Sequence, residues 1–286
     1  MSATSKNIRK TTCSKLCLSL LCTLSLAGCS AFFYSPPPMT NSSSMVEFLY
    51  PDGQRPENEV TMPPTLELPL RIGIAFVPPK SSWGSTVSHA EQIDLLNIVK
   101  QQFENEDYVE TIEVLSSSYL QGVSGFQALE QIGSLLDLDV FALVSWNQVV
   151  TSDDTPASLL YWTIIGAYTI PGTRNSVNTL LDVAVFDLKS RKLLLRAPGV
   201  SSATDTSTAI SAGRVTKSIR DQSLTSATNQ MAENLAFEVE RFSERVKEEG
   251  VAEITYGSNY QGSFSPLLVF FGMFLAGVHL VRRRFC

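Results

Sequence analysis

The spacing of apolar and polar positions predicts a regular alternation of strands and helices in the first half of the chain. The nearly continuous apolar run at residues 70–77 predicts a strand, which Pro78 and Pro79 end. Ser88, with Glu91 three residues later, matches a capping box at the start of a helix. In chain order the predicted elements are a strand at 70–77, a helix after Ser88, a strand at 108–115, a helical stripe at 126–136 and a strand at 139–149.

After residue 150 the pattern changes to apolar runs separated by turn residues. Strands are predicted at residues 158–170, 179–188 and 193–197, and the Ser/Thr/Ala-rich stretch 200–213 is expected to be a loop. Pro171-Gly172 and Lys189-Ser190 are turn residues, which favours antiparallel hairpins. Apolar positions then recur mostly four residues apart over 215–249, which predicts a long amphipathic helix that Gly250 ends.

This order of elements predicts the α/β (α+β) class: a single domain with a β-α-β-α-β start, antiparallel hairpin strands and a long closing C-terminal helix. The Pro- and Ser-rich stretch before it predicts an extended tether, in which only the run 46–50 is a candidate for a short docked piece. The predicted organisation is a signal peptide at 1–29, a tether at 30–69, a globular domain at 70–250, a linker at 251–263 and an apolar helix with an Arg cluster at 264–286.

Charge and cysteine are both distributed unevenly. The formal net charge is −6, but seven of the 22 basic residues lie in 1–29 and 263–286, where there is no acidic residue, so the middle carries a net charge of −13. An acidic middle argues against nucleic acid as a partner, because phosphate contacts need clustered Lys and Arg. No cysteine lies between residues 30 and 285, so no disulfide can stabilise the domain and its core must do so.

The N-terminal 29 residues have the three parts of a secretory signal: a basic start, an apolar run at about 16–26 and small residues at a cleavage site. The sequence Leu26-Ala27-Gly28-Cys29 resembles a bacterial lipobox. This resemblance implies cleavage by the lipoprotein-class signal peptidase between Gly28 and Cys29, and acylation of Cys29 with chains such as palmitate. The covalent lipid would be the only prosthetic group, with membrane lipid as partner, because several acyl chains give a stable anchor. An ordinary signal peptide that contains cysteine is the alternative.

The C-terminal end has a second apolar segment. A small, polar stretch at 257–263 precedes a 16-residue apolar run at 266–281 and the cluster Arg282, Arg283 and Arg284. One interpretation is a transmembrane helix that anchors the tail, with the Arg cluster on the cytoplasmic side. The other is a sorting tail, because the arrangement resembles the GlyGly-CTERM tail that rhombosortase, a rhomboid-type protease, is thought to cut. Here Gly262-Ser263 stands where that tail has Gly-Gly.

A lipobox together with this tail resembles the rhombotarget lipoprotein family, and segments 70–78, 138–146, 158–168 and 190–199 match it. The resemblance implies processing near Gly262 and Ser263, lipid-anchored localisation in the cell envelope, and an envelope protein as partner. Ser30 after the lipidated cysteine implies sorting to the outer membrane, facing the periplasm or the outside. The hairpin at 185–196 is similar to that of periplasmic lipoproteins of the curli-secretion and penicillin-binding-protein-activator type, a likeness of fold alone.

The sequence offers little for catalysis or metal binding. His89 is the one histidine outside the tail, so a zinc site or a Ser-His-Asp triad is not expected. The pairs Asp137/Asp139 and Asp153/Asp154 are typical of turns and caps. The favoured interpretation is therefore a non-enzymatic envelope lipoprotein that binds or assembles with another component. A periplasmic enzyme, with acids such as Asp182 in a polar cleft, and a lipoprotein held permanently at both ends remain the alternatives.

Overall fold

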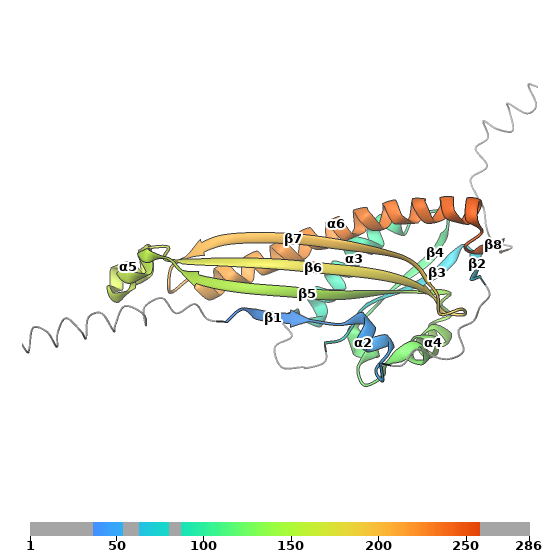
Figure 1. Ribbon diagram of the computed structural model, residues 1–286, viewed down its shortest axis with the longest axis horizontal. Helices are drawn as coiled ribbons and strands as arrows, with labels where there is room; N and C mark the ends of the chain where they lie inside the picture. Colours follow the sequence, from blue (N-terminus) through green and yellow to red (C-terminus); the bar gives the residue numbers. More distant parts are fainter. Residues whose placement is uncertain (1–36, 54–62, 80–86, 258–286) are drawn as a thin grey trace, which may run out of the picture. The chain divides into compact units, whose positions relative to one another are not determined.

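The first half of the domain has the predicted β-α-β-α-β order. The computed structural model describes residues 37–53, 63–79 and 87–257. Strand β3 (Leu70–Phe76) pairs in parallel with β4 (Val109–Leu115) on one side and with β5 (Val140–Asp154) on the other. The helices α3 (His89–Phe103) and α4 (Gly125–Leu136) connect them (Figure 1). A parallel strand covered by helices on both faces is apolar at almost every position, which explains the continuous run at 70–77.

The start of α3 is fixed by the capping box that the sequence predicts. The hydroxyl of Ser88 accepts a hydrogen bond from the backbone N–H of Glu91 at 3.2 Å, and the Glu91 carboxylate accepts one from the backbone N–H of Ser88 at 3.4 Å. These two bonds satisfy backbone donors that have no partner inside the helix. The short 3₁₀ helix η2 (Ser117–Leu120) lies between β4 and α4.

The second half contains longer strands than the sequence predicts. Strands β5, β6 (Thr173–Asp187) and β7 (Leu193–Ser207) are neighbours in a sheet with the order β4-β3-β5-β6-β7. The loop expected at 200–213 is wrong, because β7 continues through it to Ser207. This end of β7 is polar and therefore shows no apolar alternation in the sequence. It is held by hydrogen bonds such as the one between the hydroxyls of Ser176 and Thr204 at 3.1 Å.

The strand predicted at 158–170 is also wrong. The segment forms the 3₁₀ helix η3 (Pro156–Trp162) and the short helix α5 (Ile164–Thr169). Pro156 at the first position favours a helical turn, and the Thr163 hydroxyl caps α5 by accepting a hydrogen bond from the backbone N–H of Gly166. The long helix α6 (Ala212–Glu249) confirms the helix predicted at 215–249. The mixed α+β class, with a sheet and a long C-terminal helix, is confirmed.

Both segments predicted as linkers contain regular structure. The tether contains β1 (Met39–Ser42), which pairs antiparallel with β5, the short helix α2 (Met45–Leu49) and β2 (Thr65–Leu68). The stretch 251–263 contains β8 (Glu253–Tyr256), which pairs in parallel with β2. Ordered structure thus starts well before Leu70. Neither strand of this pair is apolar enough alone to predict a strand, and their pairing joins residues almost 190 positions apart.

By their internal contacts the residues divide into two compact units. Of the described residues, one contains 37–42, 147–180 and 200–227, and the other contains 43–53, 63–79, 87–146, 181–199 and 228–257. Strands β5, β6 and β7 and helix α6 contribute residues to both. We call these the first and the second unit.

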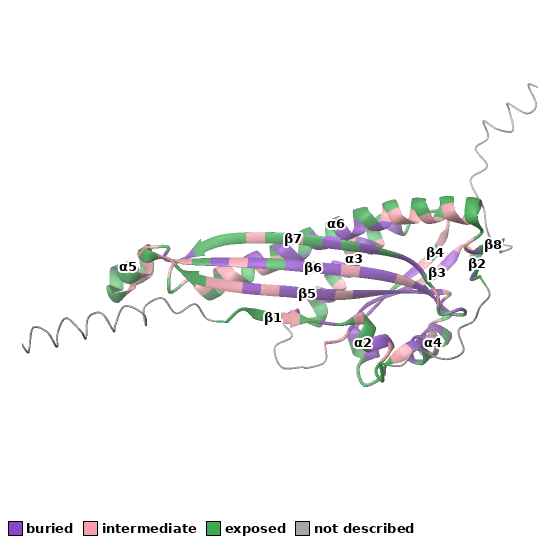
Figure 2. Cartoon of the chain, in the orientation of Figure 1, coloured by how far each residue is buried: buried purple, intermediate pink, exposed green. Residues whose placement is uncertain are grey.

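The second unit has a densely packed core on one face of its sheet. Phe141, Leu143 and Phe186 pack there against α4 and α2, with the rings of Phe126 and Phe186 edge to face at 5.5 Å between centroids. The first unit has a smaller cluster around Val150, Val177 and Ile219. Figure 2 shows that α6 buries residues along one side and exposes the other, as its amphipathic sequence requires.

Candidate functional site

The two faces of the sheet in the second unit are packed differently. Along β5, Phe141 and Leu143 belong to the packed core, whereas Val140 and Ala142 point to the opposite face, because successive strand residues alternate. The same alternation separates Phe186 from Val185 on β6. The face that carries Val140, Ala142 and Val185 lines a cavity of about 480 Å³.

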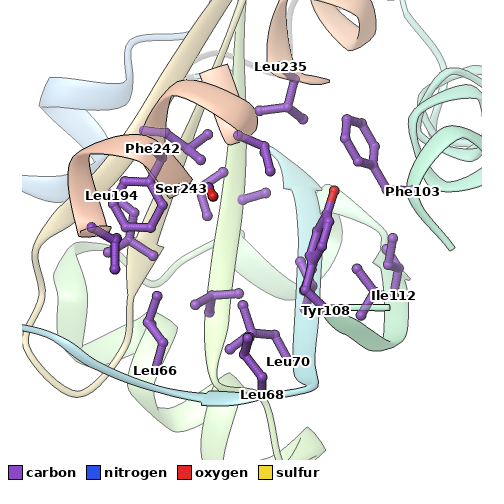
Figure 3. Close-up of a pocket in the computed structure, with 18 of the residues that line it drawn as sticks. Leu66, Leu68, Leu70, Phe103, Tyr108, Ile112, Leu194, Leu235, Phe242 and Ser243 are labelled. Atoms are coloured by element: carbon purple, nitrogen blue, oxygen red, sulfur yellow. The ribbon is translucent and has the colours of Figure 1, made fainter. Parts of the chain in front are cut away.

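Three layers of the second unit enclose this apolar cavity. Strands β3 to β7 form its floor, the side chains of α3 and α6 cover it, and the β2–β8 pair closes one side (Figure 3). From α6 it is lined by Leu235, Val239, Phe242, Ser243, Val246 and Lys247. Spacings of three and four place the apolar members on one face of the helix. The volume is in the range of pockets that bind small molecules.

Part of the apolar lining is only half-buried, although other lining residues such as Val140 and Ala142 are buried. Ile72, Val185, Val239 and Phe242 are half-buried although their side chains are apolar. In the opposite face Phe141 and Leu143 are fully buried. Apolar surface left without contact loses both the hydrophobic and the dispersion contributions of packing. The cavity is therefore an apolar surface whose burial by a bound molecule would be favourable.

Polar groups at the cavity are few. Tyr108 stands at the N-terminal end of β4, and Figure 3 shows its hydroxyl directed toward Phe103 and Leu235. Burial, followed by the negative charge of Glu106, raises the pKa of Tyr108 to about 12. Among the described residues this hydroxyl makes no hydrogen bond, so it can donate one to a bound molecule. Lys247 is exposed and carries the one charge among the residues that line the cavity.

The acids considered for catalysis are paired with arginines. Asp139 accepts hydrogen bonds from the Arg71 guanidinium at 3.1 Å and from the Arg71 backbone N–H at 3.0 Å, and Asp137 forms a second ion pair with Arg71. These interactions, led by the hydrogen bond that Arg71 donates to Asp139, raise the pKa of Arg71. The carboxylate of Asp182 accepts from Arg196 Nε at 2.7 Å. The structure does not bring these acids together in one polar cleft.

The acids of the second loop and the histidine have structural contacts as well. Asp154 accepts a hydrogen bond from the Thr173 hydroxyl at 2.9 Å, at the end of β5. His89 Nδ1 lies 3.2 Å from the hydroxyl of Ser117, but that buried hydroxyl donates to Gln92 at 2.7 Å. A serine nucleophile would need access to substrate and a base that takes its proton, and this geometry gives Ser117 neither. Within 37–53, 63–79 and 87–257 no group of three or more potential metal ligands occurs.

The residues predicted for processing lie outside the described part of the chain: Gly28, Cys29, Gly262, Ser263, Arg282, Arg283 and Arg284. The prediction of a transmembrane helix within 264–286 has to be corrected. Among the described residues no helix combines the length and apolar character needed to cross a membrane. The predicted segment itself is also outside the described residues.

No protein-family model matches the chain, and no curated protein matches its sequence. Several solved structures have a related arrangement. A neuraminyllactose-binding hemagglutinin homolog from Helicobacter pylori is 9% identical with a TM-score of 0.38, and the match covers 66% of this chain and 95% of that one. A Xanthomonas campestris protein of the family DUF330 is 9% identical with a TM-score of 0.32, covering 64% and 92%. PelC from Paraburkholderia phytofirmans, a dodecamer, is 9% identical with a TM-score of 0.24, covering 67% and 97%. At these scores no function follows from the likeness.

The sequence did not predict the cavity. Its lining residues, including the apolar stripe on α6, have the same spacing as residues of a filled core. A cavity depends on how far apart α6, α3 and the sheet lie, which the pattern of apolar positions does not specify. Nothing in the sequence around the half-buried Tyr108 marks it as a residue that lines a cavity.

Proposed function

We propose that this protein is a non-catalytic binding protein of the cell envelope whose second unit holds an apolar ligand. The observation that supports the proposal is the cavity of about 480 Å³, which is lined by aliphatic and aromatic side chains. Ligand sites are typically concave and mostly apolar, with a few polar groups that fix orientation. Here Tyr108 and Ser243 are those groups, and Lys247 lies at the rim.

The lining favours a ligand with a single hydrocarbon chain and an acidic head group. A chain would cover the half-buried surfaces of Ile72, Val185 and Val239, and each buried methylene contributes about 0.8 kcal/mol. A carboxylate placed at the rim would lie near the ammonium group of Lys247. No other described residue that lines the cavity is charged. A fatty acid or a related acyl chain has both features.

A series of saturated fatty acids from octanoate to stearate would test this proposal with the purified protein. The expected affinity rises about fourfold per methylene and stops rising once the chain fills the cavity. Titration followed by displacement of a neutral fluorescent probe measures it. Lys247→Gln is expected to lower the affinity for every fatty acid and to leave the affinity for the corresponding alcohols unchanged. Affinity that does not depend on chain length would contradict an acyl-chain site.

The anchoring part of the proposal is supported by the sequence at the ends of the chain. Residues 26–29 have the order of a lipobox, and we propose that Cys29 carries acyl chains after cleavage behind Gly28, so that the protein is held at the membrane surface. The stretch around Gly262 and Ser263 is the proposed cleavage position of a rhomboid-type sortase. Sorting to the outer membrane is proposed from Ser30.

Intact mass of the protein purified from native membranes would test both processing steps. We expect a chain that begins at Cys29, carries added acyl groups and ends near Gly262. A chain that begins at Cys29 but extends to Cys286 would contradict C-terminal processing alone. A Cys29→Ser variant that differs from the parent mass only by the exchange of sulfur for oxygen, and that stays attached to the membrane, would contradict lipidation. Neither outcome bears on the cavity, so the two parts of the proposal fail separately.

A further inference from the structure

The segment between β5 and β6 exposes a dense group of large apolar side chains. It comprises η3 and α5 and belongs to the first unit. Trp162 is 79% exposed and Ile164 82% exposed, although both would normally be buried. Figure 2 shows α5 mostly in the colour of exposed residues. The exposed apolar side chains of this tip are Leu159, Leu160, Trp162, Ile164, Ile165 and Tyr168.

The tip contains no charged residue. The 19 positions from Thr155 to Thr173, between Asp154 and Arg174, include no Asp, Glu, Lys or Arg. The protein has a net charge of −6, and its acidic residues lie in the middle of the chain. The segment 155–173 nevertheless forms an uncharged surface at the end of a hairpin. A contiguous exposed apolar surface of this kind marks a site of contact with a partner or a membrane.

The polar groups of the tip are used within the tip. The Thr163 hydroxyl donates to the carbonyl of Leu160 at 2.8 Å and accepts from the backbone N–H of Gly166 at 2.9 Å. The Thr169 hydroxyl donates to the carbonyl of Ile165 at 2.7 Å. Leaving water therefore costs these groups little, because their hydrogen bonds are made internally. The same bonds leave few polar groups with which a protein partner could be recognised.

Tyr161 fixes the tip to the base of the hairpin. Its hydroxyl donates to the carbonyl of Ser207 at 2.9 Å and accepts from the backbone N–H of Gly172 at 2.7 Å. Gly172 is required there, because a Cβ atom would lie 2.6 Å from the backbone nitrogen of Ser158. The apolar side chains are thus held outward by a fixed scaffold, which lowers the entropy that binding would cost.

We propose that this tip inserts into the interfacial region of a lipid bilayer. Trp and Tyr prefer that region, because their rings are apolar and their N–H or O–H groups reach water, and Trp162 and Tyr168 flank the apolar pair Ile164 and Ile165. An uncharged contact surface with satisfied polar groups suits a lipid surface better than a protein interface, which requires matched hydrogen bonds at its rim. The proposal does not depend on lipidation at Cys29 or on the cavity of the second unit.

Tryptophan fluorescence of the full chain can test the proposal at the tip itself. The chain has three tryptophans, and substituting Trp83 and Trp146 by Phe leaves Trp162 as the only one. Trp146→Phe removes an indole N–H that is buried without a hydrogen-bond partner, so this change breaks no hydrogen bond. The matched protein with Trp83→Phe and Trp162→Phe keeps only the buried Trp146. Both are mixed with phosphatidylcholine vesicles, with and without bromine on the acyl chains.

The expected result is a blue shift of Trp162 emission and strong quenching by the brominated lipid, with Trp146 unchanged. Because the tip is uncharged, the quenching should not depend on salt, and adding phosphatidylglycerol should not increase it. Absence of quenching at Trp162 would overturn the proposal. A blue shift that rises with protein concentration and needs no vesicles would instead assign the tip to contact between copies of the chain.

A pair of charge substitutions provides the second arm. Ile164→Asp with Ile165→Asp is expected to reduce quenching of Trp162 to the level of Trp146, because two carboxylates would enter the interface. Leu135→Asp adds a charge at another exposed apolar residue, 74% exposed on α4, and should leave the quenching as it is. Both variants change surface residues, so each should keep the far-ultraviolet circular dichroism of the parent. Equal quenching in the Ile164/Ile165 double variant and the parent would contradict insertion of the tip.

Discussion

Replacing Phe141 by Ala is expected to lower the free energy of unfolding by about 3–5 kcal/mol, because it leaves a large void in the packed face of the sheet. Phe141 is fully buried in the core cluster, where Leu138 and Leu143 also pack. Rigid elements on both sides, β3 and α4, limit the collapse that could fill the void. Urea unfolding measured by circular dichroism gives the value.

The matched control removes a phenylalanine from the opposite face. Phe242 lines the cavity and is half-buried, so Phe242→Ala deletes fewer contacts and enlarges a space that is already there. Its expected cost is about 1 kcal/mol, from partial loss of buried apolar area. Similar losses for the two variants would mean that the two faces are equally well packed, and the cavity would then not exist in solution.

Adding volume should have opposite effects at two positions of β6. Val183→Phe is expected to destabilise the protein by about 1–3 kcal/mol, because Val183 is fully buried and is not among the residues that line the cavity. Val185, two residues on and on the same side of the strand, borders the cavity, so Val185→Phe can place its ring there. Its expected effect ranges from neutral to about 1 kcal/mol of added stability.

The same substitution should also block the proposed ligand. A phenyl ring at Val185 takes the space of about three methylenes of an acyl chain, which corresponds to roughly 50-fold weaker binding of the longest acids. The affinity for shorter acids should fall by a smaller factor. The fatty-acid titration on Val185→Phe measures this, with Val183→Phe at a temperature where it is folded as the control. Destabilisation by both substitutions with unchanged affinity would place the ligand elsewhere.

The acidic candidates show how far sequence spacing can predict a site. Asp137 and Asp139 were singled out as a pair and as typical turn residues, and the structure holds both against Arg71, 66 and 68 residues earlier in the sequence. No local pattern marks Arg71 as their partner. The residues that could matter for processing, with Cys29 foremost, were predicted from motifs alone and remain predictions.

Local patterns determined the elements whose signal is contained in a few consecutive residues. The capping box of Ser88 and Glu91, the strand at 70–77 and the long amphipathic helix could be predicted because periodicity and capping act within one or two turns. Tertiary structure decided the rest. The polar end of β7 and the pair β2–β8 gain their hydrogen bonds from distant strands, and the helical tip at 156–169 depends on the hydroxyl of Tyr161 reaching Ser207. Whether an apolar face is filled or hollow is decided by the separation of whole elements, so alternate apolar residues of the same strands form a solid core on one side of the sheet and line a cavity on the other.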